Sequence, residues 1–166
     1  MTTLINEQYL KEYSPLPLNI NIEDIMPYVL ITEHLWIRPL IGITQYEELQ
    51  HQVEDNNVTE LNSTLLLKIY PLLSFATCFE ALPILMYHIS EVGITKGHSE
   101  NSSSITNGDV NYINSHLRTQ CAVLQNELIE WLEEHQEHYP LLRIEKPSTS
   151  PSQQLYNTNR NGKQID

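Results

Sequence analysis

The sequence predicts an all-α fold, a small helical bundle of three to four helices with an extended arm at each end. Apolar residues recur at spacings of three and four along several long stretches, which is the period of a helix. No stretch of alternating apolar and polar residues competes with this pattern. The chain has 166 residues, 40% of them hydrophobic, which is enough for one domain with its own core.

Residues 1–20 are expected to form an N-terminal arm. Pro15 and Pro17 disfavour a helix there and favour an extended, polyproline-like chain. The arm is nevertheless too apolar to stay in solvent, so we expect it to pack against another surface. Its large apolar side chains are Leu4, Ile5, Tyr9, Leu10, Tyr13, Leu16 and Leu18.

The first two helices are predicted by the residues at their N-termini. Asn21 is a good N-cap for a helix over residues 22–36, whose acidic first turn suits the positive end of the helix dipole. Thr44 and Glu47 have the spacing of a capping box, which predicts a second helix over residues 45–54.

A buried corner is predicted between these two helices. Pro39 disfavours helical geometry at Arg38, and Gly42 is a typical helix terminator with a positive φ. We expect Trp36 and Tyr46 to pack on the corner and hold it. These five residues are the structural site that the sequence indicates.

A third helical segment, residues 62–90, is apolar on nearly all sides and is expected to be the central, buried helix. Pro71 and Pro83 lie inside it, and each removes a backbone hydrogen bond. The helix is therefore expected to bend or split at these positions. Residues 94–108 are polar and rich in Ser and Asn, which indicates a loop.

A fourth helix is predicted over residues 109–137 and is expected to end before Pro140. One apolar seam runs along it in steps of three and four. The seam consists of Val110, Ile113, Leu117, Cys121, Leu124, Leu128 and Trp131. We therefore expect three parts in the chain: an N-terminal arm (1–20), a helical domain (21–142) and an extended C-terminal tail (143–166).

The charge balance restricts the partners of the chain. It has 21 acidic and 9 basic residues, a formal net charge of −12, which argues against gripping nucleic acid phosphates or an anionic membrane surface. Neither a signal peptide nor a membrane span is expected, because the apolar stretch 72–87 is short and contains Glu80 and Pro83. Cys78 and Cys121 are then interpreted as reduced core thiols.

No motif for catalysis or cofactor binding is present, so we expect no enzyme activity, no cofactor and no metal. A helical di-iron site needs two Glu-x-x-His pairs, and the chain supplies one, Glu48 with His51. The carboxylates and histidines of residues 133–138 are interpreted as a solvated helix end. A surface nickel or zinc site is the alternative for that cluster.

Glu80 is the acidic residue whose surroundings most need explaining. It lies between apolar neighbours in the predicted central helix, where a carboxylate must be paired, neutral or solvated. We expect a structural pair with a cation such as Arg38 or Arg118, or exposure on a polar stripe of the helix. A catalytic acid is the alternative.

Several short segments follow one another in a characteristic order. They are Ile25-Met26-Pro27-Tyr28, Trp36-Ile37-Arg38-Pro39-Leu40-Ile41-Gly42, Gln45-Tyr46-Glu47-Glu48-Leu49, Glu80-Ala81-Leu82-Pro83, Gly93-Ile94, Ile129-Glu130-Trp131-Leu132 and Tyr139-Pro140-Leu141. This series, over residues 1–142, resembles the head–tail connector (adaptor) proteins of tailed phages, most closely the crAss-like phage type. The order of the segments carries the resemblance, since each segment alone is short and apolar.

The resemblance implies a structural virion protein without enzyme activity. Connector proteins of this kind are helical bundles that form rings, commonly of twelve subunits, below the portal. The implied partners are further copies of the chain, the portal protein, further tail or connector proteins, and passing genomic DNA without sequence-specific binding. The implied location is the head–tail junction of the virion, after assembly in the host cytoplasm, with no membrane contact.

Within such a ring, two segments are expected to contact partners. The loop, with Ser99 and Ser103, is expected to meet a neighbouring ring protein or to face the channel. The tail has few large apolar residues, and we expect it to lie extended across an adjacent subunit with Leu155 and Tyr156 as anchors. The alternative function is a small cytosolic helical protein-binding module, whose fourth-helix seam docks a partner helix.

Overall fold

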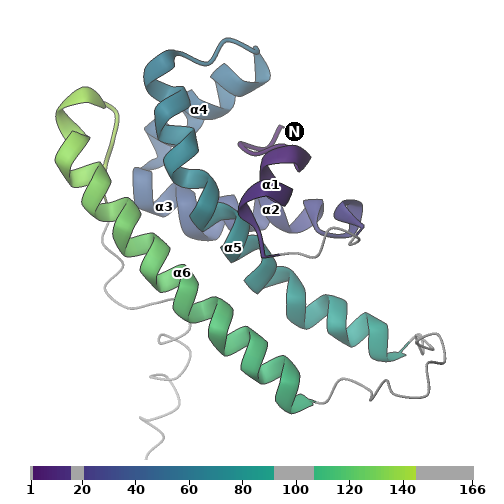
Figure 1. The fold of residues 1–166 in the computed structure, drawn as a ribbon. Coiled ribbons are helices and arrows are strands. Elements are labelled where there is room, and N and C mark those ends of the chain that lie inside the picture. The colour runs from purple at the N-terminus through teal and green to yellow at the C-terminus, as the bar shows by residue number, and fades with distance from the viewer. Residues whose placement is uncertain (1, 16–20, 92–106, 145–166) are drawn as a thin grey trace, which may run out of the picture.

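The computed structural model describes residues 2–15, 21–91 and 107–144, and these are helical with no strand among them, as the all-α prediction requires (Figure 1). These described ranges contain five helices, because α2, a π-helical turn and α3 form one continuous run. The elements are α1 (Glu7–Tyr13), a 3-10 turn (Ile22–Asp24), α2 (Met26–Thr32), the π turn (Glu33–Ile37), α3 (Arg38–Ile41), α4 (Ile43–Glu54), α5 (Glu60–Glu91), α6 (Asn107–His135) and a 3-10 turn (Gln136–His138).

The helix beyond the predicted three to four is α1, which forms where an extended arm was expected. Asn6 caps it, since its side-chain Oδ1 accepts a hydrogen bond of 3.0 Å from the backbone N–H of Tyr9. Pro15 follows the last turn of α1, where a proline breaks no helical hydrogen bond. The expectation of an extended conformation is therefore wrong for residues 7–13, while Pro17 lies outside the described residues.

The N-terminal segment is part of the main core, as its apolar composition predicts. Leu4, Ile5 and Leu10 are almost completely buried. Tyr9 stacks on Tyr70 of α5 with ring centroids 4.9 Å apart. The predicted boundary between arm and helical domain therefore does not separate two bodies within the described residues.

The corner between the first two predicted helices differs from expectation at Arg38. This residue is helical, with φ −55° and ψ −43°, and its backbone N–H bonds the carbonyl of Glu33 in the π pattern. A π turn holds one extra residue, which displaces the carbonyl that the Pro39 ring would otherwise strike. The proline is thus accommodated by a wider turn instead of breaking the helix.

Gly42 ends α3 and begins α4. Its φ is 85°, a left-handed conformation that favours glycine. Because the chain turns at this residue, α4 starts at Ile43, two residues before the predicted helix. No side chain caps α4, so the predicted capping box of Thr44 and Glu47 is wrong.

The central helix is α5, as predicted, and it contacts α1, α2, the π turn and α6. It is continuous past Pro71 and Pro83, so it does not split, but Figure 1 shows that it is bent. By length and composition its stretch Glu60–Leu82 passes for a membrane span among the described residues. However, 61% of that window is buried inside the protein, as in the core helix of a bundle.

Helix α6 packs along α5 and carries the predicted seam, which is buried unevenly. Leu117, Cys121 and Leu128 are buried, whereas Ile113 near the start of the helix is 41% exposed. Cys121 and Cys78 are both free and buried, in agreement with the prediction of core thiols. The seam therefore closes the core mainly through the second half of α6.

After α6 the chain returns to the corner. The Tyr139 hydroxyl donates to the backbone carbonyl of Leu61 at 2.9 Å, and Leu142 is fully buried. The backbone N–H of Arg143 then bonds the carbonyl of Ile41 at 3.0 Å. The packed domain consequently continues past residue 142, where the tail was predicted to begin.

Candidate functional site

The described residues contain no group of three or more His, Cys, Asp and Glu side chains placed to hold a metal ion. At the end of α6, the His135 ring stacks on Trp131 with centroids 4.4 Å apart, and His138 lies 3.6 Å from Glu137. Glu48 accepts a hydrogen bond from the side chain of Gln52. These side chains have neighbours in the protein itself, and they do not converge on one point.

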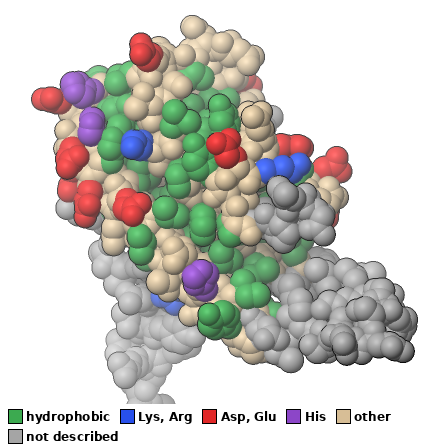
Figure 2. Space-filling view, in the orientation of Figure 1, with side chains coloured by type: hydrophobic (Ala, Val, Ile, Leu, Met, Phe, Trp, Pro, Cys, Tyr) green, Lys and Arg blue, Asp and Glu red, His purple; other side chains and the backbone are tan. Residues whose placement is uncertain are grey.

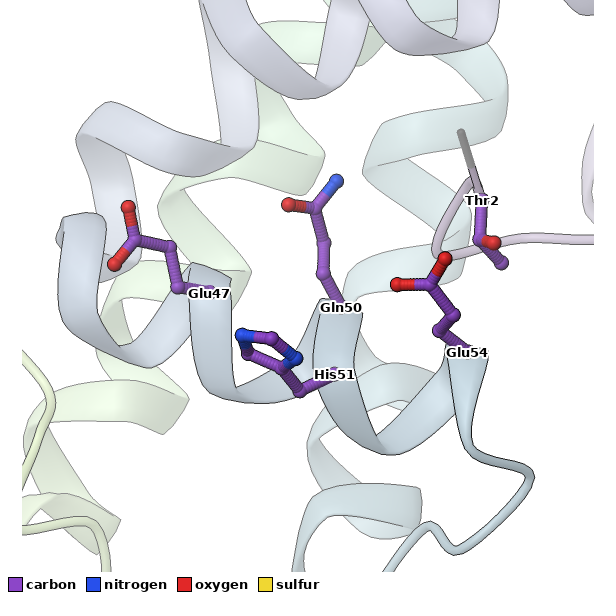
Figure 3. Close-up of a pocket in the computed structure, with 5 residues that line it drawn as sticks. All are labelled: Thr2, Glu47, Gln50, His51 and Glu54. Carbon is purple, nitrogen blue, oxygen red and sulfur yellow. The ribbon is translucent and has the colours of Figure 1, made fainter.

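A small polar pocket of about 220 Å³ lies between α4 and the N-terminal segment (Figure 3). Glu47, Gln50, His51 and Glu54 line it from α4, and Thr2 faces them from the N-terminal segment. The pocket is open and bounded mainly by one face of one helix. Gln50 connects the pocket to the interior, because its side-chain N–H donates to the hydroxyl of Tyr46 at 2.8 Å.

Behind Gln50 lies a buried polar cluster centred on Glu33. One carboxylate oxygen of Glu33 accepts a hydrogen bond from the backbone N–H of Leu4 at 2.6 Å, and the other accepts from the Tyr46 hydroxyl at 2.9 Å. Glu33 is fully buried. This side chain, which interrupts the apolar stripe of the first predicted helix, therefore joins three segments: the N-terminus, the π turn and α4.

Burial changes the protonation of this cluster. Loss of hydration raises the pKa of the Glu33 carboxyl from 4.5 to about 7, against the opposing effect of its hydrogen bonds to Leu4 and Tyr46. Near neutral pH the buried carboxyl is therefore half protonated. Because its partners are a backbone N–H of the N-terminal segment and a hydroxyl of α4, we interpret the cluster as a clamp on the N-terminal segment.

Glu80 is held differently from either structural expectation. One of its carboxylate oxygens accepts a hydrogen bond of 2.9 Å from the indole N–H of Trp36, and the side chain is half-buried. Neither Arg38 nor Arg118 pairs with it in the described part of the chain, so the predicted ion pair is wrong. The indole supplies the donor in place of a cation, which satisfies the carboxylate.

A groove of about 460 Å³ lies between α5 and α6 and is called here the α5–α6 groove. Its floor is apolar and combines residues of both helices. Figure 2 shows hydrophobic side chains lying together on this face, with acidic and histidine side chains along its outer edge. The lining consists of Leu67, Lys68 and Pro71 from α5 and of Leu124, Glu127, Leu128, Glu130, Trp131 and Glu134 from α6.

Trp131 is the centre of this groove. The ammonium group of Lys68 lies 5.8 Å from the centre of its ring, within the range of a cation–π contact. The rings of His135 and Tyr139 also pack against it, with centroids at 4.4 and 5.9 Å. The indole is thus fixed from several sides, and the groove has a preformed aromatic wall.

Residues 37–152 match a family described as a family of unknown function (DUF6712). The match covers well over half of the chain. This chain belongs to that family. Comparison with curated proteins and with solved structures gives no match.

In this DUF6712 member, the matched range includes α4, α5, α6 and the α5–α6 groove, and it starts after Glu33. The family region thus carries the groove and Tyr46, whereas the N-terminal segment and Glu33 lie outside it. Within the corner, Trp36, Tyr46 and Gly42 are buried, Arg38 is half-buried and Pro39 is exposed.

The predicted contact residues Ser99, Ser103, Leu155 and Tyr156 lie outside the described residues. The alternative function placed a docking site on the fourth-helix seam, and three members of that seam, Leu124, Leu128 and Trp131, line the α5–α6 groove. The contribution of α5 and the acidic rim were missed. The signal available in the sequence was the row Glu127, Glu130 and Glu134 beside that seam. It places charges at the edge of an apolar face.

Proposed function

We propose that this chain is a structural virion protein, a subunit of a ring in the head–tail connector of a tailed phage. The observation that carries the proposal is the ordered series of short segments that resembles connector proteins. Several of these segments lie at defined places in the fold: Trp36 and Gly42 lie on either side of α3, the Tyr46 hydroxyl of α4 donates to Glu33, and Trp131 lines the α5–α6 groove.

The surface of the domain supports a subunit that is covered by neighbours. Large apolar side chains are exposed on several elements, among them Ile31 at 48%, Leu35 at 52% and Ile43 at 55%. Ile31 and Leu35 are one helical turn apart and share a face. Exposed apolar groups of this size fit lateral contacts in an assembly.

The charge of the chain also supports a DNA conduit. A formal charge of −12 for each subunit gives a ring a strongly acidic surface. Phosphate groups are repelled by such a surface, so DNA can pass without being held. In this proposal the ring docks below the portal, extends the DNA channel and presents a platform for the next tail component.

A direct test is electron microscopy of the purified full chain mixed with the portal protein of the same phage. We expect ring-shaped particles of the chain stacked coaxially on the portal. Portal particles that look the same with and without the chain, at concentrations where the chain is folded, would contradict the proposal. Omitting the portal provides the control for non-specific stacking.

The second candidate is a small cytosolic module that binds one partner helix. The observation in its favour is the α5–α6 groove, because an apolar groove with charged edges is the form that receives an amphipathic helix. This candidate predicts a monomer or dimer that binds one helical peptide per chain. The ring candidate predicts a large, discrete assembly.

A further inference from the structure

The α5–α6 groove has the chemistry of a docking site whose occupant is apolar and carries positive charge. Its lining includes Leu67, a large apolar side chain of α5 that is 44% exposed. Three carboxylates, Glu127, Glu130 and Glu134, border it in successive turns of α6. Lys68 is the one basic side chain in the lining and already lies against Trp131. The rim is therefore acidic in balance.

The last residues of the same chain have the complementary chemistry. The chain as a whole contains 21 acidic and 9 basic residues, but residues 145–166 contain two acidic and three basic ones, Lys146, Arg160 and Lys163. This stretch is therefore a locally basic segment of an acidic protein. Leu155 and Tyr156 are adjacent large apolar residues in it, and Arg160 follows four residues later.

We propose that the C-terminal tail, residues 145–166, of one copy binds in the α5–α6 groove of a neighbouring copy. Leu155 and Tyr156 cover the apolar floor beside Trp131, and the basic residues that follow face the acidic rim. The choice of a neighbouring copy rests on the proposed ring. The choice of the tail itself rests on the charge and the anchors just described.

The length of the tail allows this connection. The described chain ends at Ile144, so ten residues precede Leu155. Ten extended residues span at most about 36 Å, more than twice the radius of gyration of about 14 Å expected for a domain of this size. A tail that extends beyond its own domain can meet either the groove of the same copy or that of a neighbouring copy. The experiment must therefore separate the two.

Photo-cross-linking of the full-length chain provides that separation. A photoreactive phenylalanine analogue replaces Tyr156, and the protein is mixed in equal parts with a copy uniformly labelled with ¹⁵N before irradiation. We expect cross-linked peptides that join the tail to residues 67–71 or 124–134, with one partner unlabelled and the other labelled. Cross-links found only within one copy, or only outside the groove, would overturn the proposal.

Matched variants test the groove itself. Leu67 and Leu61 are both 44% exposed on α5, but only Leu67 lines the groove. Leu67→Asp is expected to reduce the cross-link yield by about tenfold, because a carboxylate would be buried under the tail, while Leu61→Asp leaves the yield unchanged. Equal yields from both variants would show that the tail does not use this groove.

The mass of the same samples separates this inference from the proposed ring. Intermolecular cross-links at the groove in a dimer would contradict the ring and leave the tail assignment standing. A ring that forms without cross-links at the groove would contradict the tail assignment alone.

Discussion

Glu33 illustrates how one residue can join distant parts of this fold. Its carboxyl group is fully buried and accepts hydrogen bonds from the Leu4 backbone and from the hydroxyl of Tyr46. A buried carboxyl is tolerated because each oxygen has a donor. The cost of burying the ionised form remains, and it raises the pKa to about 7.

The shifted pKa predicts a particular dependence of stability on pH. The folded protein binds the Glu33 proton more tightly than the unfolded chain, so stability from this group is present below pH 4.5 and is lost as pH rises through about 7. Glu33→Gln removes the ionisation. The difference in unfolding free energy between the variant and the unchanged protein is therefore expected to grow, in favour of the variant, by up to about 3 kcal/mol as the pH rises from 5 to 8.

Urea unfolding at both pH values measures this difference. Glu23→Gln removes the same charge at an exposed position and serves as the control, for which no comparable gain is expected. A Glu33→Gln variant whose relative stability is the same at pH 5 and pH 8 would show that the buried carboxyl does not titrate in this range.

Gly42 carries a second, independent prediction. A Cβ atom at this position would lie 2.8 Å from the Cβ of Arg143, and the backbone φ of 85° disfavours any branched residue. Gly42→Val is therefore expected to lower the unfolding free energy by about 1–3 kcal/mol. Ile43→Val, at the exposed next position, is the control in thermal unfolding, and an equal melting temperature for the two variants would contradict this account of the corner.

The helices show which parts of the fold can be derived from the sequence. The helical period and the apolar character of α5 and α6 were sufficient to predict two long helices and the central position of α5. Local signals were less reliable. Pro39 predicts a break in the helix, but a π turn accommodates it. Thr44 predicts a helix start, but the turn at Gly42 makes α4 begin at Ile43. The partners of Glu80 and Glu33 depend on contacts 44 and 29 residues away in the chain, which no local pattern encodes.

The link between α5 and α6 carries a prediction about assembly. Residues 99–104 are Ser/Asn-rich and contribute no large apolar side chain to a core. Deleting them is expected to leave the circular dichroism spectrum and the melting temperature unchanged and to impair ring formation or portal binding. Loss of folding would show that these residues are part of the core.

The end of α6 carries a prediction about metals. The side-chain nitrogen Nδ1 of His135 lies 2.8 Å from the carbonyl of Trp131, and His138 is close to Glu137. Because these histidines face separate neighbours, we expect no bound metal. Elemental analysis of protein purified without a histidine tag should find less than stoichiometric zinc, nickel and iron; a one-to-one ratio of any of them would overturn this expectation.

The whole molecule is an acidic helical domain with apolar surfaces left uncovered. The match to the family of unknown function (DUF6712) covers α3 to α6 and the α5–α6 groove. The exposed apolar residues of α2 and α4 and the groove lie on different elements, so one small partner would not cover them all. An assembly with several contacts per subunit accounts for this distribution, and a ring provides it.

The mass of the purified full-length chain in solution, measured with and without the portal protein, tests the proposed ring most directly. The proposal predicts a single large species, about twelve times the 19.3 kDa mass of the chain, either alone or on the portal. A monomer or dimer of folded protein under both conditions would contradict the ring and favour the helix-binding module.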